Sequence, residues 1–203
     1  MKLLTIRSMY NFLLFIYHLP MDNVIVFHGT GWTPHDFWFP YLKNTLSKEK
    51  FTISIPQLPN STRSELSEQL PFVLKSFSYD ENTIFVGHSS GCPLILSILE
   101  NITTPIKKAI LVAGFCEPTQ STPHPILQDT YDWHTIKNNA QQFVFINSLD
   151  DPWGCNEKQG QMMQKKIGGE LIICSNQGHM GSNAHNQPYK EFPLVKFFIE
   201  NWR

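Results

Sequence analysis

Short apolar runs rich in β-branched residues alternate with longer amphipathic runs along most of this 203-residue chain. Several short runs are almost continuously apolar, which is typical of strands covered on both faces of a sheet. We expect strands at 24–27, 51–55, 83–86, 106–112, 143–146 and 171–174. We expect helices at 35–48, 63–78, 90–100, 131–139, 156–167 and 188–201. Because strands that alternate with helices form βαβ units, the sequence predicts a mainly parallel sheet of about six strands in a three-layer α/β/α sandwich.

The length of the chain fits one domain with a full-sized core. We predict a single domain over residues 22–203, preceded by an apolar appendage or extension over 1–21. The apolar run at 12–17 follows two basic residues, but no small-x-small cleavage site comes after it. That run is also too short to span a bilayer, so we expect no stable membrane insertion. Met21 is an alternative natural start.

Charge and cysteine usage exclude several classes of protein. Sixteen basic and seventeen acidic side chains give a formal charge of -1 without a basic stripe, so a nucleic-acid binder is not expected. The cysteines at 92, 116, 155 and 174 are too far apart for a metal knuckle or a CxxC motif. We expect reduced, mostly buried thiols and a cytoplasmic protein. We expect no metal and no organic cofactor, since no cluster of His, Asp and Glu has ligand spacing.

The stretch Gly-His-Ser-Ser-Gly at 87–91 follows the third expected strand and precedes a helix. It fits G-x-S-x-G, the nucleophile elbow, in which a sharp turn from strand to helix exposes the central serine. The residues two before and two after that serine pass close to neighbouring backbone, so both must be glycine. The motif predicts Ser89 as nucleophile and the backbone N–H of Ser90 as a donor to the substrate oxygen. A purely structural glycine-rich turn is the alternative.

A serine hydroxyl needs a base, which a third group holds in place. In chains with a nucleophile elbow these groups follow in the order acid, then histidine. Asp150 and Asp151 follow the fifth expected strand, and His179 follows the sixth in a glycine-flanked loop. We predict Asp151 as the acid, since Pro152 favours an extended conformation for the residue before it, with Asp150 as the alternative. We predict His179 as the base, with His185 as the alternative.

The remaining parts of the predicted site follow the first strand and the acid. A second oxyanion donor is expected from the loop at 28–32, with Thr30 as our choice. This loop lacks the full glycine pattern of a phosphate-binding turn. Four aromatic residues flank the predicted mouth and favour a small apolar acyl or aryl group, with core packing as the alternative for each. They are Trp32, Phe37, Trp38 and Trp153.

With these residues in place, the chain resembles the α/β-hydrolase superfamily. More narrowly, it is similar to the small serine hydrolases related to retinoblastoma-binding protein nine. The stretches 86–91, 132–137, 148–153 and 178–179 carry this resemblance, which covers roughly residues 22 to 203. The resemblance implies a minimal α/β-hydrolase fold with no large lid, and it assigns the role of acid to the aspartate before proline, Asp151. The loop at 28–32 looks more like a general esterase oxyanion loop than the family's glycine-rich one.

These observations predict a serine hydrolase that cleaves a small ester or amide through an acyl-enzyme on Ser89. A carboxylesterase and an aminopeptidase or amidase use the same machinery, so both stay open. The alternative from another class is a non-catalytic protein-binding module on a hydrolase scaffold. The family name also suggests a protein partner.

Overall fold

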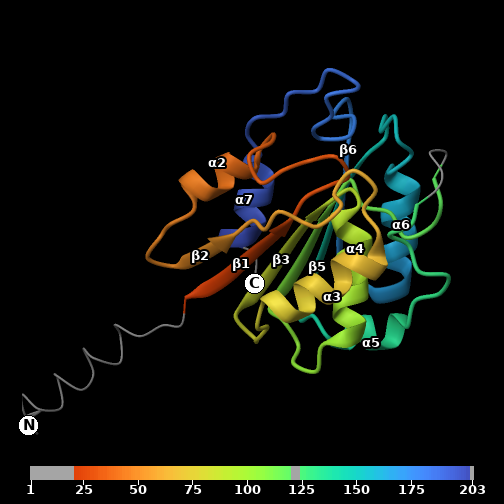
Figure 1. Cartoon of the computed structure of the whole chain (residues 1–203). Helices are drawn as coiled ribbons and strands as arrows, with labels where there is room; N and C mark the ends of the chain where they lie inside the picture. The colour runs from red at the N-terminus through yellow and green to blue at the C-terminus, as the bar shows by residue number, and fades with distance from the viewer. Residues whose placement is uncertain (1–20, 120–123, 202–203) are drawn as a thin grey trace, which may run out of the picture.

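The computed structural model describes residues 21–119 and 124–201, so the appendage expected at the amino end lies outside it except for Met21. The sheet has six parallel strands in the order β2-β1-β3-β4-β5-β6 (Figure 1). The strands are β1 (Asp22–Phe27), β2 (Phe51–Ser54), β3 (Thr83–His88), β4 (Lys108–Val112), β5 (Phe143–Ser148) and β6 (Glu170–Cys174). Each lies where the sequence predicts a strand.

Helices cover both faces of this sheet. Figure 1 shows α3, α4 and α6 on one face and α2 and α7 on the other. Their bounds are α2 (Phe39–Thr45), α3 (Leu66–Ser76), α4 (Gly91–Asn101), α5 (Trp133–Asn138), α6 (Glu157–Ile167) and α7 (Pro193–Glu200). The predicted three-layer α/β/α sandwich is therefore confirmed. Among the described residues no helix is both long enough and apolar enough to cross a membrane.

Successive side chains of each strand enter different cores. Phe27 and Phe85 pack in the cluster that also holds Ile95 of α4. Val26 and Val86, their neighbours in the chain, pack in the cluster with the apolar side chains of α2 and α7. A strand points alternate side chains to opposite faces, so a strand that is apolar at every position requires a layer on each side.

Several helices are shorter than the sequence predicts, and two of them begin four or five residues late. The helix expected at 35–48 covers only Phe39–Thr45, and the one expected at 188–201 covers only Pro193–Glu200. In both, a proline occupies one of the first two helical positions. Proline has no N–H to donate and its ring fixes φ, so it favours the first turn over the helix interior.

The strand order places a topological switch point between β1 and β3. The chain passes from β1 outward to β2 and then returns to β3 on the other side of β1. Loops that leave the carboxyl ends of β1 and β3 therefore diverge and open a crevice, which is where open parallel sheets bind ligands. In Figure 1 the loops after β1, β3, β5 and β6 gather at this same edge of the sheet.

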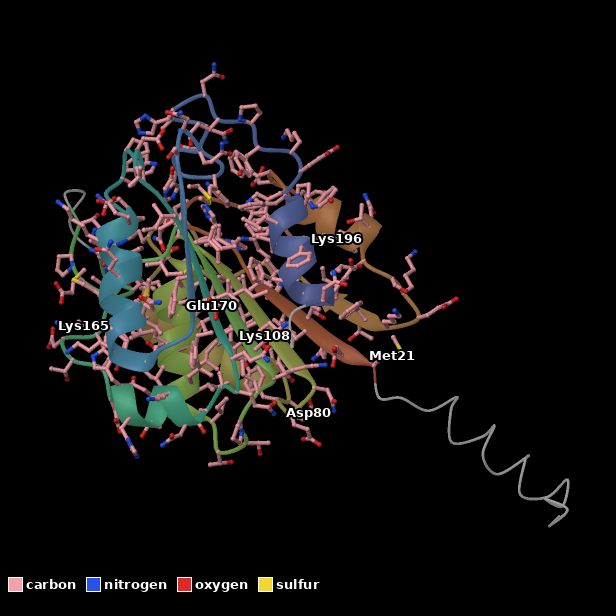
Figure 2. The ribbon with its side chains drawn as sticks, turned by 180° about the vertical axis from the view of Figure 1, so that it is seen from behind. Met21, Asp80, Lys108, Lys165, Glu170 and Lys196 are labelled. Carbon is pink, nitrogen blue, oxygen red and sulfur yellow. The ribbon has the colours of Figure 1, made fainter. Side chains whose placement is uncertain are left out.

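The opposite edge of the sheet contains a buried lysine. Lys108, the first residue of β4, has only 1% of its surface exposed. Its Nζ donates to the backbone oxygen of Phe198, close to the end of α7, over 2.5 Å. Figure 2 shows Lys108 just below α7. A cation near the last carbonyls of a helix is favourable, so this contact links the sheet to α7.

Candidate active site

The turn between β3 and α4 has the geometry of a nucleophile elbow. Ser89 has a φ of +52°, a left-handed conformation that is strained for a residue with a side chain, and its N–H donates to Val112 over 3.0 Å. A Cβ on Gly87 would lie 2.8 Å from the Gly91 oxygen, and a Cβ on Gly91 would lie 2.2 Å from the Phe27 oxygen. Both glycines are therefore required by close backbone contacts, as the motif predicts.

A buried histidine and aspartate meet beside this turn. Nδ1 of His179 lies 2.7 Å from Oδ2 of Asp151, and a carboxylate only accepts, so the histidine donates from Nδ1. Nε2 is thereby left as an acceptor. The other Asp151 oxygen accepts the N–H of Trp153 at 2.8 Å. Asp150 is exposed and accepts the Ser148 hydroxyl at 2.5 Å, which lowers the pKa of Asp150.

The main chain of His179 is held from two sides. Its N–H donates to Oε1 of Gln187, and its carbonyl accepts from Nε2 of His88, each over 2.8 Å. The His88 ring also stacks on Trp32 with 4.0 Å between centroids and 14° between planes. Burial first, then the nearby His179, holds the pKa of His88 well below its ordinary value. His88 is therefore a neutral donor, and the sequence shows only that it lies in the elbow.

One hydroxyl links the two loops that carry the predicted oxyanion donors. Ser64 accepts from the hydroxyl of Thr30 at 2.9 Å and from that of Ser90 at 3.2 Å, and donates to the Ser61 carbonyl. Ser64 is 2% exposed and has a φ of +51°. Ser90 stands at the start of α4, where first-turn N–H groups have no partner within the helix. No motif in the sequence indicates Ser64.

The side chain of His28, at the start of the loop after β1, holds this loop in place through two hydrogen bonds to the main chain. Its Nε2 accepts the N–H of Leu58 at 3.1 Å, and its Nδ1 donates to the carbonyl of Gly29 at 3.0 Å. Burial is the main cause that lowers the pKa of His28, so the ring is a neutral structural bridge. This bridge fixes the backbone just before Thr30, the predicted oxyanion donor.

A cavity of about 710 Å³ opens over these residues. Ser89, Ser90, Thr30 and His179 all line it, so the predicted nucleophile, base and oxyanion residues face one space. Drug-sized ligands occupy pockets of this size. The apolar part of the wall is formed by Trp32, Phe115, Pro125, Ile126 and Trp153.

Two of the four aromatic residues expected at the mouth are core residues instead. Trp38 is fully buried, and its Nε1 donates to the carbonyl of Met180 at 3.1 Å. Phe37 is buried against the ring of Trp32, with 4.0 Å between centroids. Only Trp32 and Trp153 of that set line the cavity. His185, the alternative base, is exposed and packs its ring on Trp153 at 5.1 Å.

A cysteine lies next to the histidine and aspartate. The ligand atoms of Asp151, Cys155 and His179 all lie within 4.8 Å of one another, and all three residues are buried. Burial, and secondarily the charge of Asp151, raises the pKa of the Cys155 thiol well above its ordinary value. All four cysteines are free and three are buried, as expected. The spacing of the cysteines in the sequence does not reveal the contact of Cys155 with the predicted site.

A parallel sheet whose third strand ends in a strained serine turn, with a buried His–Asp pair at the same edge, defines the α/β-hydrolase class. A family model described as serine hydrolase matches residues 24–197, and the chain belongs to this family. Its activity is hydrolytic, as the sequence resemblance predicts.

Comparisons with individual proteins agree with this assignment. The chain is 32% identical to YdeN of Bacillus subtilis over 134 residues, which cover 64% of this chain and 70% of YdeN. The crystal structure of YdeN superposes with a TM-score of 0.79 at 26% identity and covers 86% of this chain and 95% of YdeN. Serine hydrolase RBBP9 of Rattus norvegicus is 24% identical over 173 residues, covering 83% of this chain and 91% of RBBP9. A hydrolase of Oleispira antarctica, olei00960, shares the fold with a TM-score of 0.61 at 14% identity, covering 90% and 92% of the two chains.

Proposed function

We propose that this protein cleaves a small ester or amide by acyl transfer to Ser89, with His179 as general base and Asp151 as the acid that holds it. The observation that carries the proposal is the buried contact of 2.7 Å between His179 Nδ1 and Asp151 Oδ2 at a cavity that Ser89 also lines. A histidine that donates from Nδ1 presents its Nε2 lone pair, the form that a general base needs.

In this mechanism Nε2 of His179 takes the proton of the Ser89 hydroxyl as the oxygen attacks the substrate carbonyl. Asp151 stabilises the imidazolium that forms. The backbone N–H groups of Ser90 and Thr30 hold the negative charge on the substrate oxygen, and loss of one such donor typically lowers turnover by about 10² to 10³. His179 then gives its proton to the leaving group, and water releases the acyl group by the same steps.

The lining of the cavity supports an uncharged substrate with an apolar group. Aromatic and aliphatic side chains form one part of its wall, and Thr30, Ser64 and Ser182 add hydroxyls. Arg63 is the one side chain with a fixed charge among the described residues of this wall, and its guanidinium is already paired with Glu65 at 2.9 Å. Free cysteines support the cytoplasm as the location. Residues 22–203 are proposed to act as one domain, and a protein partner stays a prediction.

A fluorophosphonate probe tests this function, since it reacts with activated serines. We expect covalent labelling of the wild type at Ser89 that disappears in Ser89→Ala. The matched control is Ser90→Ala, which removes the neighbouring hydroxyl but keeps its backbone N–H and should still be labelled. Folded wild-type protein that is not labelled would support the protein-binding module instead. A panel of p-nitrophenyl esters and aminoacyl arylamides then separates esterase from amidase.

A further inference from the structure

The buried group formed by Asp151, Cys155 and His179 offers a carboxylate oxygen, a thiol sulfur and an imidazole nitrogen within 4.8 Å of one another. These are the three kinds of side-chain atom that bind zinc in proteins. We propose that these residues form a site for a thiophilic divalent cation, Zn²⁺ or Cd²⁺, and that the bound ion inhibits the hydrolase.

The geometry requires only side-chain adjustments. Tetrahedral zinc with its usual bond lengths places its ligand atoms about 3.3 to 3.7 Å apart. The contact of 2.7 Å between His179 and Asp151 must open slightly, and the Cys155 sulfur must approach by at most about 1.5 Å. Cys155 and His179 both line the cavity, so the ion can enter from it and a water can complete the coordination.

The loops that carry the three ligands are already held in place. The second oxygen of Asp151 accepts the N–H of Trp153 at 2.8 Å, and the Cys155 carbonyl accepts from the side chain of Asn147 at 2.9 Å. The main chain of His179 is bonded at both its N–H and its carbonyl. The bond to the second Asp151 oxygen acts on a ligand side chain, and outer hydrogen bonds of that kind orient metal ligands and increase affinity. The bonds to the main chain of Cys155 and His179 fix the loops from which the other two ligands project.

Charge and protons balance when the ion binds. Cys155 releases its thiol proton to solvent, and the proton on Nδ1 of His179 is replaced by a proton on Nε2 as Nδ1 takes the metal. The carboxylate and thiolate then neutralise the two positive charges of the ion, which removes the penalty for burying them. No electron is transferred.

The inhibition follows from the position of that proton. With a proton on Nε2, His179 cannot accept the proton of Ser89. This consequence rests on the role proposed for His179 as the base, whereas the binding of the ion does not.

The test is a titration of the chelator-treated full chain with Cd²⁺, followed in two ways. A Cd–thiolate bond gives an ultraviolet charge-transfer band, and hydrolysis of p-nitrophenyl acetate reports activity. In the wild type we expect the band to saturate at one ion per chain while activity falls in parallel. Mg²⁺ should do neither, because it prefers oxygen ligands.

Variants locate the site. Cys155→Ala should lose the band, and its rate should resist Cd²⁺ when compared with its own metal-free rate. Cys174→Ala, which removes the half-buried thiol at the end of β6, should behave as the wild type. A band that disappears with Cys174, or equal inhibition of Cys155→Ala, would overturn the proposal.

The two proposals can fail separately. Ser89→Ala keeps all three ligands, so its band must persist although it cannot form an acyl-enzyme. A wrong nucleophile shows as unchanged labelling of Ser89→Ala without any metal. A wrong metal site shows as a missing band in the wild type, and a band without inhibition would overturn the inhibitory mechanism.

Discussion

Two neighbouring aspartates differ in what they contact, and this difference supports the role proposed for Asp151. Asp151 is buried against His179, whereas Asp150 is exposed and bonded to Ser148. We predict that Asp151→Asn lowers kcat/KM by about 10³ to 10⁴, because an amide no longer selects the histidine with its proton on Nδ1. Asp150→Asn is the matched control and should stay within a few-fold of the wild type. Steady-state rates on a p-nitrophenyl ester measure both, and equal losses would contradict the assignment.

The contacts of His88 indicate that it positions His179. It is not among the residues that line the cavity, but it donates to the carbonyl of His179. His88→Phe keeps a ring beside Trp32 and removes the donor, so we expect kcat to fall roughly 10- to 100-fold as His179 shifts, with KM little changed. His88→Gln carries an amide N–H that can donate to the same carbonyl, and it should recover part of the loss.

A comparison of the two His88 variants separates positioning from general support of the fold. Thermal unfolding of both proteins is measured beside the kinetics. If His88 only fills space, the glutamine variant will be no better than the phenylalanine variant, and kcat will follow the melting temperature. That result would contradict a positioning role.

At the scale of single residues, the sequence predicts the positions that a motif defines. Ser89, Asp151 and His179 follow from the elbow, the order of the groups and the loops after strands, and the structure brings Ser89 and His179 to one cavity. Ser64 and Cys155 could not be predicted. Ser64 accepts hydrogen bonds from hydroxyls of two other loops, and Cys155 lies close to Asp151 and His179 only in the folded chain. Contacts of this kind have no fixed spacing along a chain.

At the scale of elements, the elbow depends on how closely α4 approaches β1. A Cβ on Gly91 would lie 2.2 Å from the carbonyl oxygen of Phe27, so backbone must move to admit it. We predict that Gly91→Ala destabilises the protein by about 3 kcal/mol or more, or prevents folding. Urea unfolding followed by circular dichroism measures the effect.

The matched control for this substitution is Gly168→Ala at the end of α6. Gly168 has a φ of +80° and a ψ of -164°, a conformation that residues other than glycine rarely adopt, and no atom lies within 4 Å of an added Cβ. We therefore expect backbone strain of about 1 to 3 kcal/mol without a steric clash. Gly91→Ala proving as stable as Gly168→Ala would show that close packing of β1 and α4 is not what requires glycine in the elbow.

The elements themselves were predictable because their signals are local. A strand apolar at every position indicates burial on both faces, and each expected strand is present in the sheet. The first residues of α2 and α7 were less predictable, since amphipathic spacing also extends to the residues before the prolines at which these helices begin. The order of the strands in the sheet could not be predicted from any single segment, because it depends on how all the βαβ units pack together.

At the scale of the whole molecule, the carboxyl ends and the amino ends of the strands differ in function. The carboxyl edge carries the proposed site, while Lys108 at the amino edge joins the sheet to α7. Burial lowers the pKa of Lys108 to about 8 from an ordinary 10.5, with Lys107 adding to the shift and Asp22 opposing it. This pairing of a strand with the last helix is long-range, and the sequence shows only a lysine at the start of a strand.

The lowered pKa of Lys108 makes stability depend on pH in a defined direction. Between about pH 8 and pH 10.5 the unfolded chain binds a proton at this lysine and the folded chain does not. The free energy of unfolding therefore gains a contribution that increases with pH in this window, on the order of 2 kcal/mol in total.

Lys108→Met removes the titrating group at similar volume. We expect the difference in urea-unfolding free energy, wild type minus variant, to rise across the window and to stay flat below it, since both states are then protonated. The other lysines and tyrosines titrate alike in both proteins and cancel in the difference, so a flat difference from pH 8 to 10.5 would show that Lys108 keeps its ordinary pKa in the folded protein.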